Sequence, residues 1–314
     1  MSNLCLNIDQ CLELGIFART FRRPSVNEIF DAIAGYGLSC AQWNWCCVPG
    51  LPSLPESVPA EVLRSIRGAM AGSRVNICAI SATFNLIEPN AFKMGLSRLP
   101  ELAKAAIAIG CDQLTLCTGT RHPNDMWTYH PANRLPDAWN DMIDGLRQVS
   151  RIAQRFGIRL AIEPEAANVV CDAEAAERAL QELGADGEIL SIVLDAANLY
   201  RPPLDPREDG AIIDDAVARL GERISLAHAK DIAKPDPAPP AGNDAEGYDH
   251  VAAGTGILPY PHYLAALLST PKAIAAAAHG KPLPLVLHGL DEAQVPASIA
   301  FLRECMSSAN SWVR

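Results

Sequence analysis

The chain has 314 residues, of which 49% are hydrophobic and 20% are charged, and its formal net charge is −10. This composition is typical of a globular protein with a sizeable core and excludes an intrinsically disordered chain. The negative charge disfavours a nucleic-acid backbone as the main partner. No apolar run reaches the roughly 20 residues that a membrane span needs, and the N-terminal MSNLCLNIDQCLEL lacks the regions of a signal peptide.

The ten cysteines are scattered singly, except for the adjacent pair Cys46 and Cys47, and no CxxC pair occurs. Most lie within apolar runs, as Cys5, Cys78 and Cys117 do. This distribution predicts reduced core thiols in a cytoplasmic protein rather than a disulfide framework.

Strand-like apolar runs and helix-like amphipathic segments alternate along the chain. In chain order the expected strands lie at 4–8, 38–45, 75–89, 113–119, 158–163, 191–195, 224–228 and 283–288. The expected helices between them lie at 25–37, 60–72, 97–110, 137–155, 172–183, 211–221 and 261–269, and a last one begins near residue 296. This α/β alternation predicts a single (β/α)8 TIM barrel over residues 1–314. An open doubly wound sheet is the runner-up, but no glycine-rich phosphate fingerprint follows the first strand.

Local signals support parts of this pattern. Ser25 and Glu28 stand at capping-box spacing, and Asp172 is placed to cap the helix after strand five. The loop after strand four carries His122 among several aromatic residues, and loops longer than about 12 residues are usually functional or disordered. The Pro/Gly/Asp-rich stretch 233–249 after strand seven indicates a polar insertion, with a mobile lid as the less common alternative.

Strand five ends on two carboxylates, Glu163 and Glu165, on either side of Pro164. The proline stops strand pairing and leaves both acids at the C-terminal end of the strand. Three later strands end on metal-competent side chains, which are Asp195, His228 and His288. The C-terminal ends of successive parallel strands meet at one mouth of a barrel. One such residue would be an ordinary solvated strand end, but four in succession predict a shared metal site.

These motifs resemble the xylose isomerase-like TIM-barrel superfamily, in particular its sugar phosphate isomerase/epimerase branch. The resemblance covers nearly the whole chain and is carried in order by ATFNLIEP, LCTGTRHPNDMW, IEPE, LDAANL, HAKD, HVAAGTG and LVLHGLDE. It implies one divalent cation, held by residues that match Glu163, Asp195 and His228. The family's fourth ligand, a strand-eight glutamate, is His288 in this chain. Two oxygens with two imidazole nitrogens favour zinc or manganese over magnesium.

The resemblance also implies a metal-dependent isomerase or epimerase that acts on a small sugar, sugar phosphate or related polyol carbonyl compound. In the family a proton leaves the carbon next to a metal-polarised carbonyl, and two glutamates on opposite faces of the enediolate transfer it. Glu163 supplies one catalytic base, and His288 is the candidate for the other, although a metal-bound histidine is a poor proton carrier. Proton transfer by Glu163 alone, in a one-sided isomerisation or a dehydration, therefore stays open.

Further side chains around the expected mouth are candidates for binding the substrate. They are Asn85, His122, Glu165, Asn198, Lys230 and His250. For three of them a structural role competes: Asn198 could cap a turn, Lys230 could be solvated, and Glu165 could support the metal ligands.

Two other functions remain open. An endonuclease-type phosphoesterase would use several metals, but Asn198 stands where such relatives have a histidine, and the acidic charge disfavours DNA. A barrel that binds a ligand without turnover is kept open by the missing strand-eight glutamate. The expected partner is a small molecule, with no nucleic acid and no membrane, and analogy with relatives leaves a homo-oligomer open.

Overall fold

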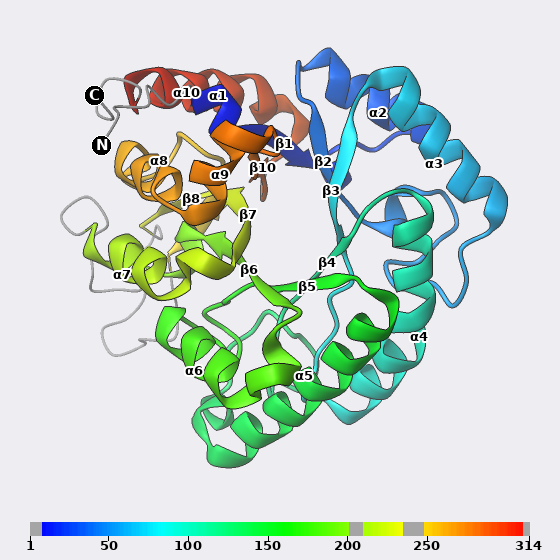
Figure 1. Cartoon of the computed structure of the whole chain (residues 1–314), viewed down its shortest axis with the longest axis vertical. Coiled ribbons are helices and arrows are strands. Elements are labelled where there is room, and N and C mark those ends of the chain that lie inside the picture. The colour runs from blue at the N-terminus through cyan, green and yellow to red at the C-terminus, as the bar shows by residue number, and fades with distance from the viewer. Residues whose placement is uncertain (1–7, 201–209, 235–247, 310–314) are drawn as a thin grey trace.

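A computed structural model of the chain describes residues 8–200, 210–234 and 248–309. Eight parallel strands close into a barrel in the order β1-β10-β7-β6-β5-β4-β3-β2 (Figure 1). They are β1 (Leu12–Phe17), β2 (Cys40–Trp43), β3 (Asn76–Ser81), β4 (Gln113–Leu116), β5 (Arg159–Ile162), β6 (Leu190–Asp195), β7 (Ile224–Ala229) and β10 (Leu283–Leu287). The predicted (β/α)8 barrel is confirmed.

Helices surround the barrel, and the first and last described ones, α1 and α10, lie next to each other (Figure 1). They are α1 (Ile8–Cys11), α2 (Val26–Gly35), α3 (Ala60–Ser73), α4 (Pro89–Ala108), α5 (Pro136–Phe156), α6 (Ala173–Leu183), α7 (Ala211–Leu220), α8 (Tyr260–Leu268), α9 (Pro271–His279) and α10 (Val295–Ala309). The alternation did not predict α9. Its first turn is capped by Thr270, whose hydroxyl accepts a hydrogen bond from the Ala273 N–H, so a second helix begins directly after α8.

The prediction of the first strand is wrong. The strand that closes the barrel is β1, whereas Ile8 begins the one-turn helix α1, and residues 4–7, with Asn7, lie outside the described residues. Gly15 explains the position of β1, because a Cβ at Gly15 would lie 2.4 Å from the Sγ of Cys40 on β2. Only glycine allows the two strands to approach this closely.

Capping explains where several helices begin. The hydroxyl of Ser25 accepts a hydrogen bond of 3.3 Å from the Glu28 N–H, and Asp172 caps α6, as the sequence predicts. Helix α4 begins earlier than expected because the Glu88 carboxylate caps a first turn that starts at Pro89.

Apolar side chains pack both inside the barrel and between its outer face and the helices. The interior layer consists of Ala79, Ala161, Val193, Leu226 and Val286. Side chains two positions apart along a strand point to the same face. The residues two positions beyond the interior layer of β5, β6, β7 and β10 are Glu163, Asp195, His228 and His288. The alternation of the strands thus directs these four side chains to the interior at the C-terminal mouth.

The expected polar insertion leaves the barrel through a two-stranded antiparallel sheet of β8 (Asp231–Ala233) and β9 (Asp249–Val251), and residues 235–247 lie outside the described residues. The buried Asp231 carboxylate fixes the base of this hairpin. It accepts four hydrogen bonds of 2.9 to 3.1 Å, from the backbone N–H groups of Ile232, Gly254, Gly256 and Leu258. One carboxylate therefore organises the connection between β9 and α8.

The cysteines of the described residues are free thiols, and Cys46 is the exposed one among them. Within the described ranges, no helix is long and apolar enough to cross a membrane.

Candidate active site

Three metal-competent side chains meet at the C-terminal ends of the neighbouring strands β5, β6 and β7. Glu163, Asp195 and His228 each offer a ligand atom, and these atoms lie within 4.8 Å of one another. The Nδ1 of His228 is 3.3 Å from Glu163 Oε1 and 3.4 Å from Asp195 Oδ2. The side chains of Asp195 and His228 are fully buried, whereas 13% of the Glu163 side chain is exposed. Glu163 is therefore the member of this cluster that a substrate can reach.

The imidazole of His228 is oriented by Gln42, a residue that the sequence did not single out. Gln42 Oε1 lies 2.8 Å from His228 Nε2, and Gln42 Nε2 donates to Thr115 Oγ1 at 3.2 Å. Because the amide oxygen is an acceptor, the hydrogen is placed on Nε2, and Nδ1 faces the two carboxylates. The lone pair on Nδ1 and the two negative carboxylates repel one another unless a proton or a metal cation lies between the nitrogen and the carboxylate oxygens.

The charges of the cluster also favour a cation. Burial opposes the charge of His228, but the Glu163 and Asp195 carboxylates raise its pKa to about 9. Burial likewise opposes ionisation of Asp195, yet Lys230 and His228 hold its pKa below the ordinary value. Asp195 Oδ2 and His228 Nδ1 are buried without a hydrogen-bond partner. Two carboxylates and one imidazole nitrogen fit a divalent metal ion as ligands, and two of their atoms, Asp195 Oδ2 and His228 Nδ1, are free to bind it.

Lys230 and Asn198 connect the two carboxylates. Lys230 Nζ lies 3.0 Å from Asp195 Oδ2 in an ion pair without hydrogen-bond geometry, and it donates to Asn198 Oδ1 at 2.8 Å. Asn198 Nδ2 donates to Glu163 Oε1 at 3.0 Å. Both Lys230 and Asn198 are buried, so Lys230 is not a solvated lysine. Lys230 offsets part of the negative charge of the cluster, and Asn198 holds the Glu163 carboxylate in place. Substrate contact by either residue stays a prediction.

His288 lies beside the cluster rather than within it. Its ring stacks on His228, with the ring centroids 4.5 Å apart, and on Phe17 of β1 at 4.9 Å. Burial, together with the charge of His228, lowers the pKa of His288 to about 3, and its Nδ1 is buried without a partner. Gly289 adopts a φ of +69° and allows the chain to turn after His288. The roles of His288 as fourth ligand and second base stay predictions.

The other expected substrate contacts are Glu165, Asn85, His122 and His250. Glu165 follows Glu163 on the same strand end, and burial is the main cause that raises its pKa to about 7, against the opposing charge of Lys230. Its contact with substrate stays a prediction.

Asn85 is buried in the β3–α4 connection, where its amide donates to the carbonyl of Thr120 at 2.8 Å. The Nδ1 of His122 accepts a hydrogen bond from the Asp125 N–H at 3.1 Å, and His250 is exposed on β9. Within the part of the chain that the structure describes, no hydrogen bond links Asn85, His122 or His250 to the cluster. Their roles also remain predictions.

Two tyrosines of α8 support the ends of β6 and β7. Tyr263 Oη lies 2.8 Å from the carbonyl of Leu194 and 3.1 Å from that of His228, and Tyr260 Oη donates to the carbonyl of Lys230 at 2.9 Å. Burial raises the pKa of both hydroxyls, so both remain donors. The sequence offers only a weak signal for them, the two aromatic residues three positions apart in YPHY at the start of a helix.

A family profile described as xylose isomerase-like TIM barrel matches residues 30–305. The chain belongs to this family. The resemblance inferred from the sequence motifs is therefore confirmed, and the Glu163–Asp195–His228 cluster is a potential metal site in a xylose isomerase-like barrel.

One curated relative of this xylose isomerase-like barrel is the inosose dehydratase of Geobacillus kaustophilus (strain HTA426). It is 29% identical over 129 residues, which cover 40% of this chain and 39% of the relative. The matched part thus spans well under half of the relative's length.

Two solved structures share the fold. A D-tagatose 3-epimerase-like protein has a TM-score of 0.69 at 14% identity, with 96% of this chain and 100% of that chain covered. The IOLI protein, solved with a zinc atom, has a TM-score of 0.63 at 13% identity, with 96% and 99% covered. At these identities the two likenesses show the barrel alone.

Proposed function

We propose that this protein is a metal-dependent isomerase or epimerase of a small sugar, sugar phosphate or related polyol carbonyl compound. The observation that carries the proposal is the Glu163–Asp195–His228 cluster, in which the partly exposed Glu163 faces the mouth. Membership of the xylose isomerase-like family and the epimerase-like neighbour add support. A partly exposed carboxylate beside a cation site suits proton transfer and favours an enzyme over a binding barrel.

One divalent ion per chain is proposed at the cluster. Oxygens of Glu163 and Asp195 and the Nδ1 of His228 would hold it, with His288 as the proposed fourth ligand. Zinc or manganese is favoured over magnesium because imidazole nitrogen is among the donors, and magnesium prefers oxygen. When bound, the ion supplies Lewis-acid polarisation of a substrate carbonyl and makes the neighbouring C–H more acidic.

Glu163 is the proposed base for that C–H. Burial opposes its ionisation, but His228 and Lys230 keep the pKa of Glu163 below its ordinary value, so the carboxylate is ready to accept a proton. The hydrogen bond from Asn198 holds Glu163 Oε1 in place. A positioned base contributes roughly 10²–10⁴-fold to the rate. Delivery of the proton to the former carbonyl carbon on the same side, with transfer of the neighbouring hydroxyl proton to the former carbonyl oxygen, completes an aldose–ketose isomerisation. His288 is the proposed second base for an epimerisation.

Six side chains are the proposed substrate contacts. They are Asn85, His122, Glu165, Asn198, Lys230 and His250. Asn198, Lys230 and Glu165 are the strongest candidates, since the first two belong to the network of the cluster and the third follows Glu163 on the end of β5.

Dehydration of the same class of compound is the second candidate function. The curated relative, an inosose dehydratase, is the observation that favours it. Elimination of water from a β-hydroxy carbonyl compound begins with the same proton abstraction by Glu163 and differs in losing a hydroxide equivalent from the next carbon. The two reactions therefore share the base and differ in the fate of the carbanion.

Metal content and proton exchange test the proposal. We expect about one zinc or manganese per chain and incorporation of deuterium from deuterated water into a sugar, sugar phosphate or keto polyol. Glu163→Gln should lower the exchange rate at least about 100-fold, within the range for loss of a catalytic base. Glu304→Gln, at an exposed position of α10, is the matched control and should retain the rate.

Absence of exchange across such a panel, or an unchanged rate in Glu163→Gln, would contradict the proposed reaction. Two or three metals per chain would instead favour a phosphoesterase. Appearance of an unsaturated ketone, detected by its ultraviolet absorbance, would identify a dehydratase.

A further inference from the structure

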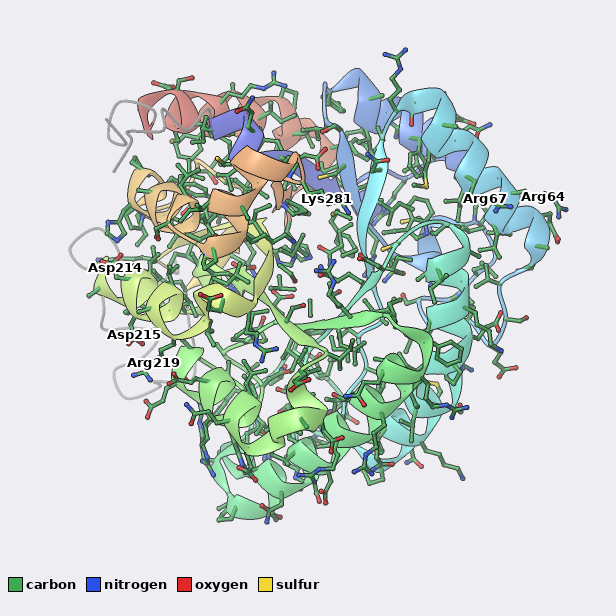
Figure 2. All side chains as sticks on the ribbon, viewed as in Figure 1. Arg64, Arg67, Asp214, Asp215, Arg219 and Lys281 are labelled. Carbon is green, nitrogen blue, oxygen red and sulfur yellow. The ribbon has the colours of Figure 1, made fainter. Side chains whose placement is uncertain are left out.

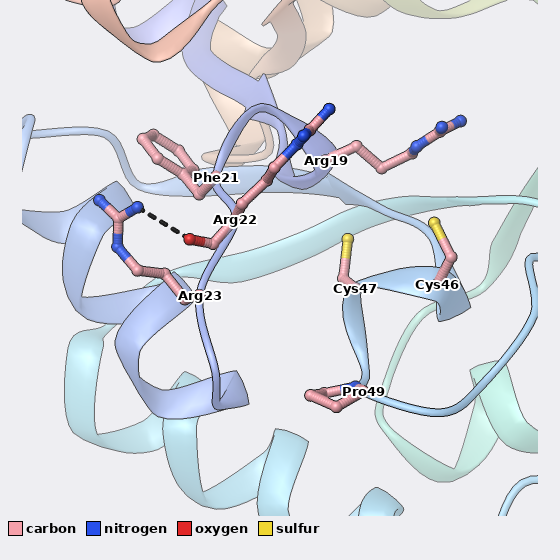
Figure 3. A pocket seen from close by; sticks show the side chains of 7 residues that line it. All are labelled: Arg19, Phe21, Arg22, Arg23, Cys46, Cys47 and Pro49. Carbon is pink, nitrogen blue, oxygen red and sulfur yellow. Dashed lines mark hydrogen bonds between the residues drawn. The ribbon is translucent and has the colours of Figure 1, made fainter.

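A pocket opens near the C-terminal ends of β1 and β2, between the short helices η1 (Ala18–Thr20) and η2 (Trp45–Cys47) (Figure 3). It encloses 490 Å³. Its lining includes Arg19, Phe21, Arg22, Arg23, Cys46 and Cys47. Three guanidinium groups thus line one pocket of a chain whose net charge is −10.

Two of the three arginines have no carboxylate partner among the described residues. Arg23 forms an ion pair with Glu292, with Nη1 2.9 Å from Oε2, and also donates to the carbonyl of Arg22. Arg19 and Arg22 are exposed, and neither forms an ion pair with a carboxylate among the described residues. Figure 3 shows their side chains extending to the same side of the loop, away from the guanidinium of Arg23.

Arg19 also connects this pocket with the metal-competent cluster. Its guanidinium carbon lies 5.9 Å from the centroid of the Phe17 ring, Phe17 stacks on His288 at 4.9 Å, and His288 stacks on His228 at 4.5 Å. Arg19 and His288 line one further pocket together with Phe17 and Gly289. A row of side chains in contact therefore connects the cluster, through His288 and Phe17, with Arg19.

We propose that Arg19 and Arg22 bind an anionic group of the substrate, a phosphate monoester or a carboxylate, at the end remote from the cluster. This inference rests on the proposed function and narrows its substrate class from polyols in general to acidic ones. Guanidinium groups present paired N–H donors that match the oxygens of either anion. A neutral sugar would offer no negative group to pair with the guanidinium groups of Arg19 and Arg22.

Cys46 provides a reporter that does not depend on turnover. Its thiol is exposed, and Figure 3 shows its Sγ on the side of the pocket where Arg19 lies. Hydrogen bonds with Cys47 and Ser53 and the charge of Arg19 lower the pKa of Cys46 to about 6, against the opposing effect of burial. An anion beside Arg19 offsets that charge and covers the thiol. Both effects slow alkylation by a neutral reagent, because the thiolate is the nucleophile.

The experiment follows alkylation of Cys46 by iodoacetamide at pH 7 in the metal-free full chain, with the labelled peptide located by mass spectrometry. Inorganic phosphate, acetate and sodium chloride are compared at equal ionic strength. We expect saturable protection of about 5-fold or more by phosphate or acetate and none by chloride. Protection by phosphate alone identifies a phosphate site, and protection by acetate identifies a carboxylate site.

The double variant Arg19→Met/Arg22→Met should lose the protection, whereas Arg64→Met, on the outer face of α3 (Figure 2), should keep it. Circular dichroism checks that each variant is folded. Equal protection in the double variant, or protection by chloride to the same extent, would overturn the proposal.

A pair of substrates that differ only in the anionic group separates this proposal from the proposed reaction. In the metal-loaded protein, the double variant should raise KM for the acidic member at least about 10-fold and leave KM for the neutral member unchanged. Anion protection of Cys46 without any turnover would retain the anion site and reject the reaction. Turnover with the same KM for both members would retain the reaction and reject the anion site.

Discussion

His228 and Gln42 are joined by a hydrogen bond of 2.8 Å that crosses the interior of the barrel from β7 to β2. The two strands are not neighbours in the sheet, and only closure of the barrel brings them together. The bond places the hydrogen of the imidazole on Nε2 and leaves Nδ1 for a metal ion. We therefore expect metal affinity to depend on Gln42, although Gln42 is not itself a proposed ligand.

We expect Gln42→Leu to lower metal affinity by about 10-fold or more, because outer partners of ligating histidines typically contribute 10–100-fold. Leucine has a similar volume but cannot accept the hydrogen bond from Nε2. Gln42→Glu is the control, since it restores an acceptor and should bind metal at least as well as the parent. Competition with a chromophoric chelator measures the affinities. Equal affinities for the Leu and Glu variants would show that the bond does not matter.

Asp195→Ala and Asn198→Ala should separate coordination from positioning. The first removes a carboxylate that lies 3.4 Å from His228 Nδ1, so we expect loss of the metal. The second removes the donor to Glu163 Oε1 and the acceptor of Lys230, so we expect the metal to remain while exchange activity falls about 10-fold. Elemental analysis and the deuterium assay measure the two effects. Similar metal content in both variants would reject the assignment of Asp195.

His288 can be tested by two substitutions of different chemistry. His288→Phe keeps a ring that can stack between Phe17 and His228 but removes both nitrogens. If His288 completes the coordination, the Phe variant should lose about 10-fold or more in metal affinity, and His288→Glu should restore it with an oxygen ligand. Unchanged affinity in His288→Phe would remove His288 from the ligand set and leave it a stacking role.

The ends of the strands were predictable because the signal is local. An apolar run that stops at Glu163, Asp195 or His228 fixes both the strand and the face of its last side chain, since the two-residue period continues from the interior layer to the mouth. Caps such as Ser25 and Asp172 are equally local, because donor and acceptor lie within one turn.

The contacts that complete the site were not predictable, since they join residues far apart in the chain. Gln42 lies 186 positions from His228, and Tyr263 lies 69 positions from Leu194. No periodicity marks either partner, and each contact exists only once the barrel has closed. The first strand was misplaced for a related reason. The apolar pattern at 4–8 looks like a strand, but the close approach of Gly15 to Cys40 decides which segment pairs with β2.

Asp231 should be important for the stability of the connection between β9 and α8. Its buried carboxylate accepts four backbone hydrogen bonds, and Asp231→Ala would leave those N–H groups without this partner. We expect a loss of about 3 kcal/mol in the free energy of unfolding, measured by urea denaturation. Asp214→Ala, at an exposed position of α7, is the matched control and should change it by less than about 0.5 kcal/mol.

The stability of the protein should depend on pH in opposite directions with and without metal. In the metal-free protein the pKa of His228 is raised to about 9, against an ordinary value of 6.5 in the unfolded chain. A raised pKa contributes stability that is complete below about pH 6.5 and is lost as the pH rises to about 9. With metal in excess, a proton no longer competes for Nδ1 as the pH rises, so metal affinity increases by up to about tenfold per pH unit. The stability that the metal confers then increases by up to about 1.4 kcal/mol per pH unit.

Denaturation at pH 6.5, 7.5 and 8.5, in the presence of a chelator or of saturating zinc, measures both trends. His228→Gln should remove most of the pH dependence in the chelator, whereas His262→Gln, at a half-buried histidine of α8 outside the cluster, should retain it. Glu163 and Asp195 do not titrate in this window, because their pKa values are lowered and both stay ionised throughout it. Glu165, whose pKa is raised to about 7, adds a smaller loss of stability between pH 6.5 and about 7, and this loss should remain in His228→Gln. If the metal-free protein became more stable between pH 6.5 and 8.5, a protonated His228 could not be the group that balances the two carboxylates.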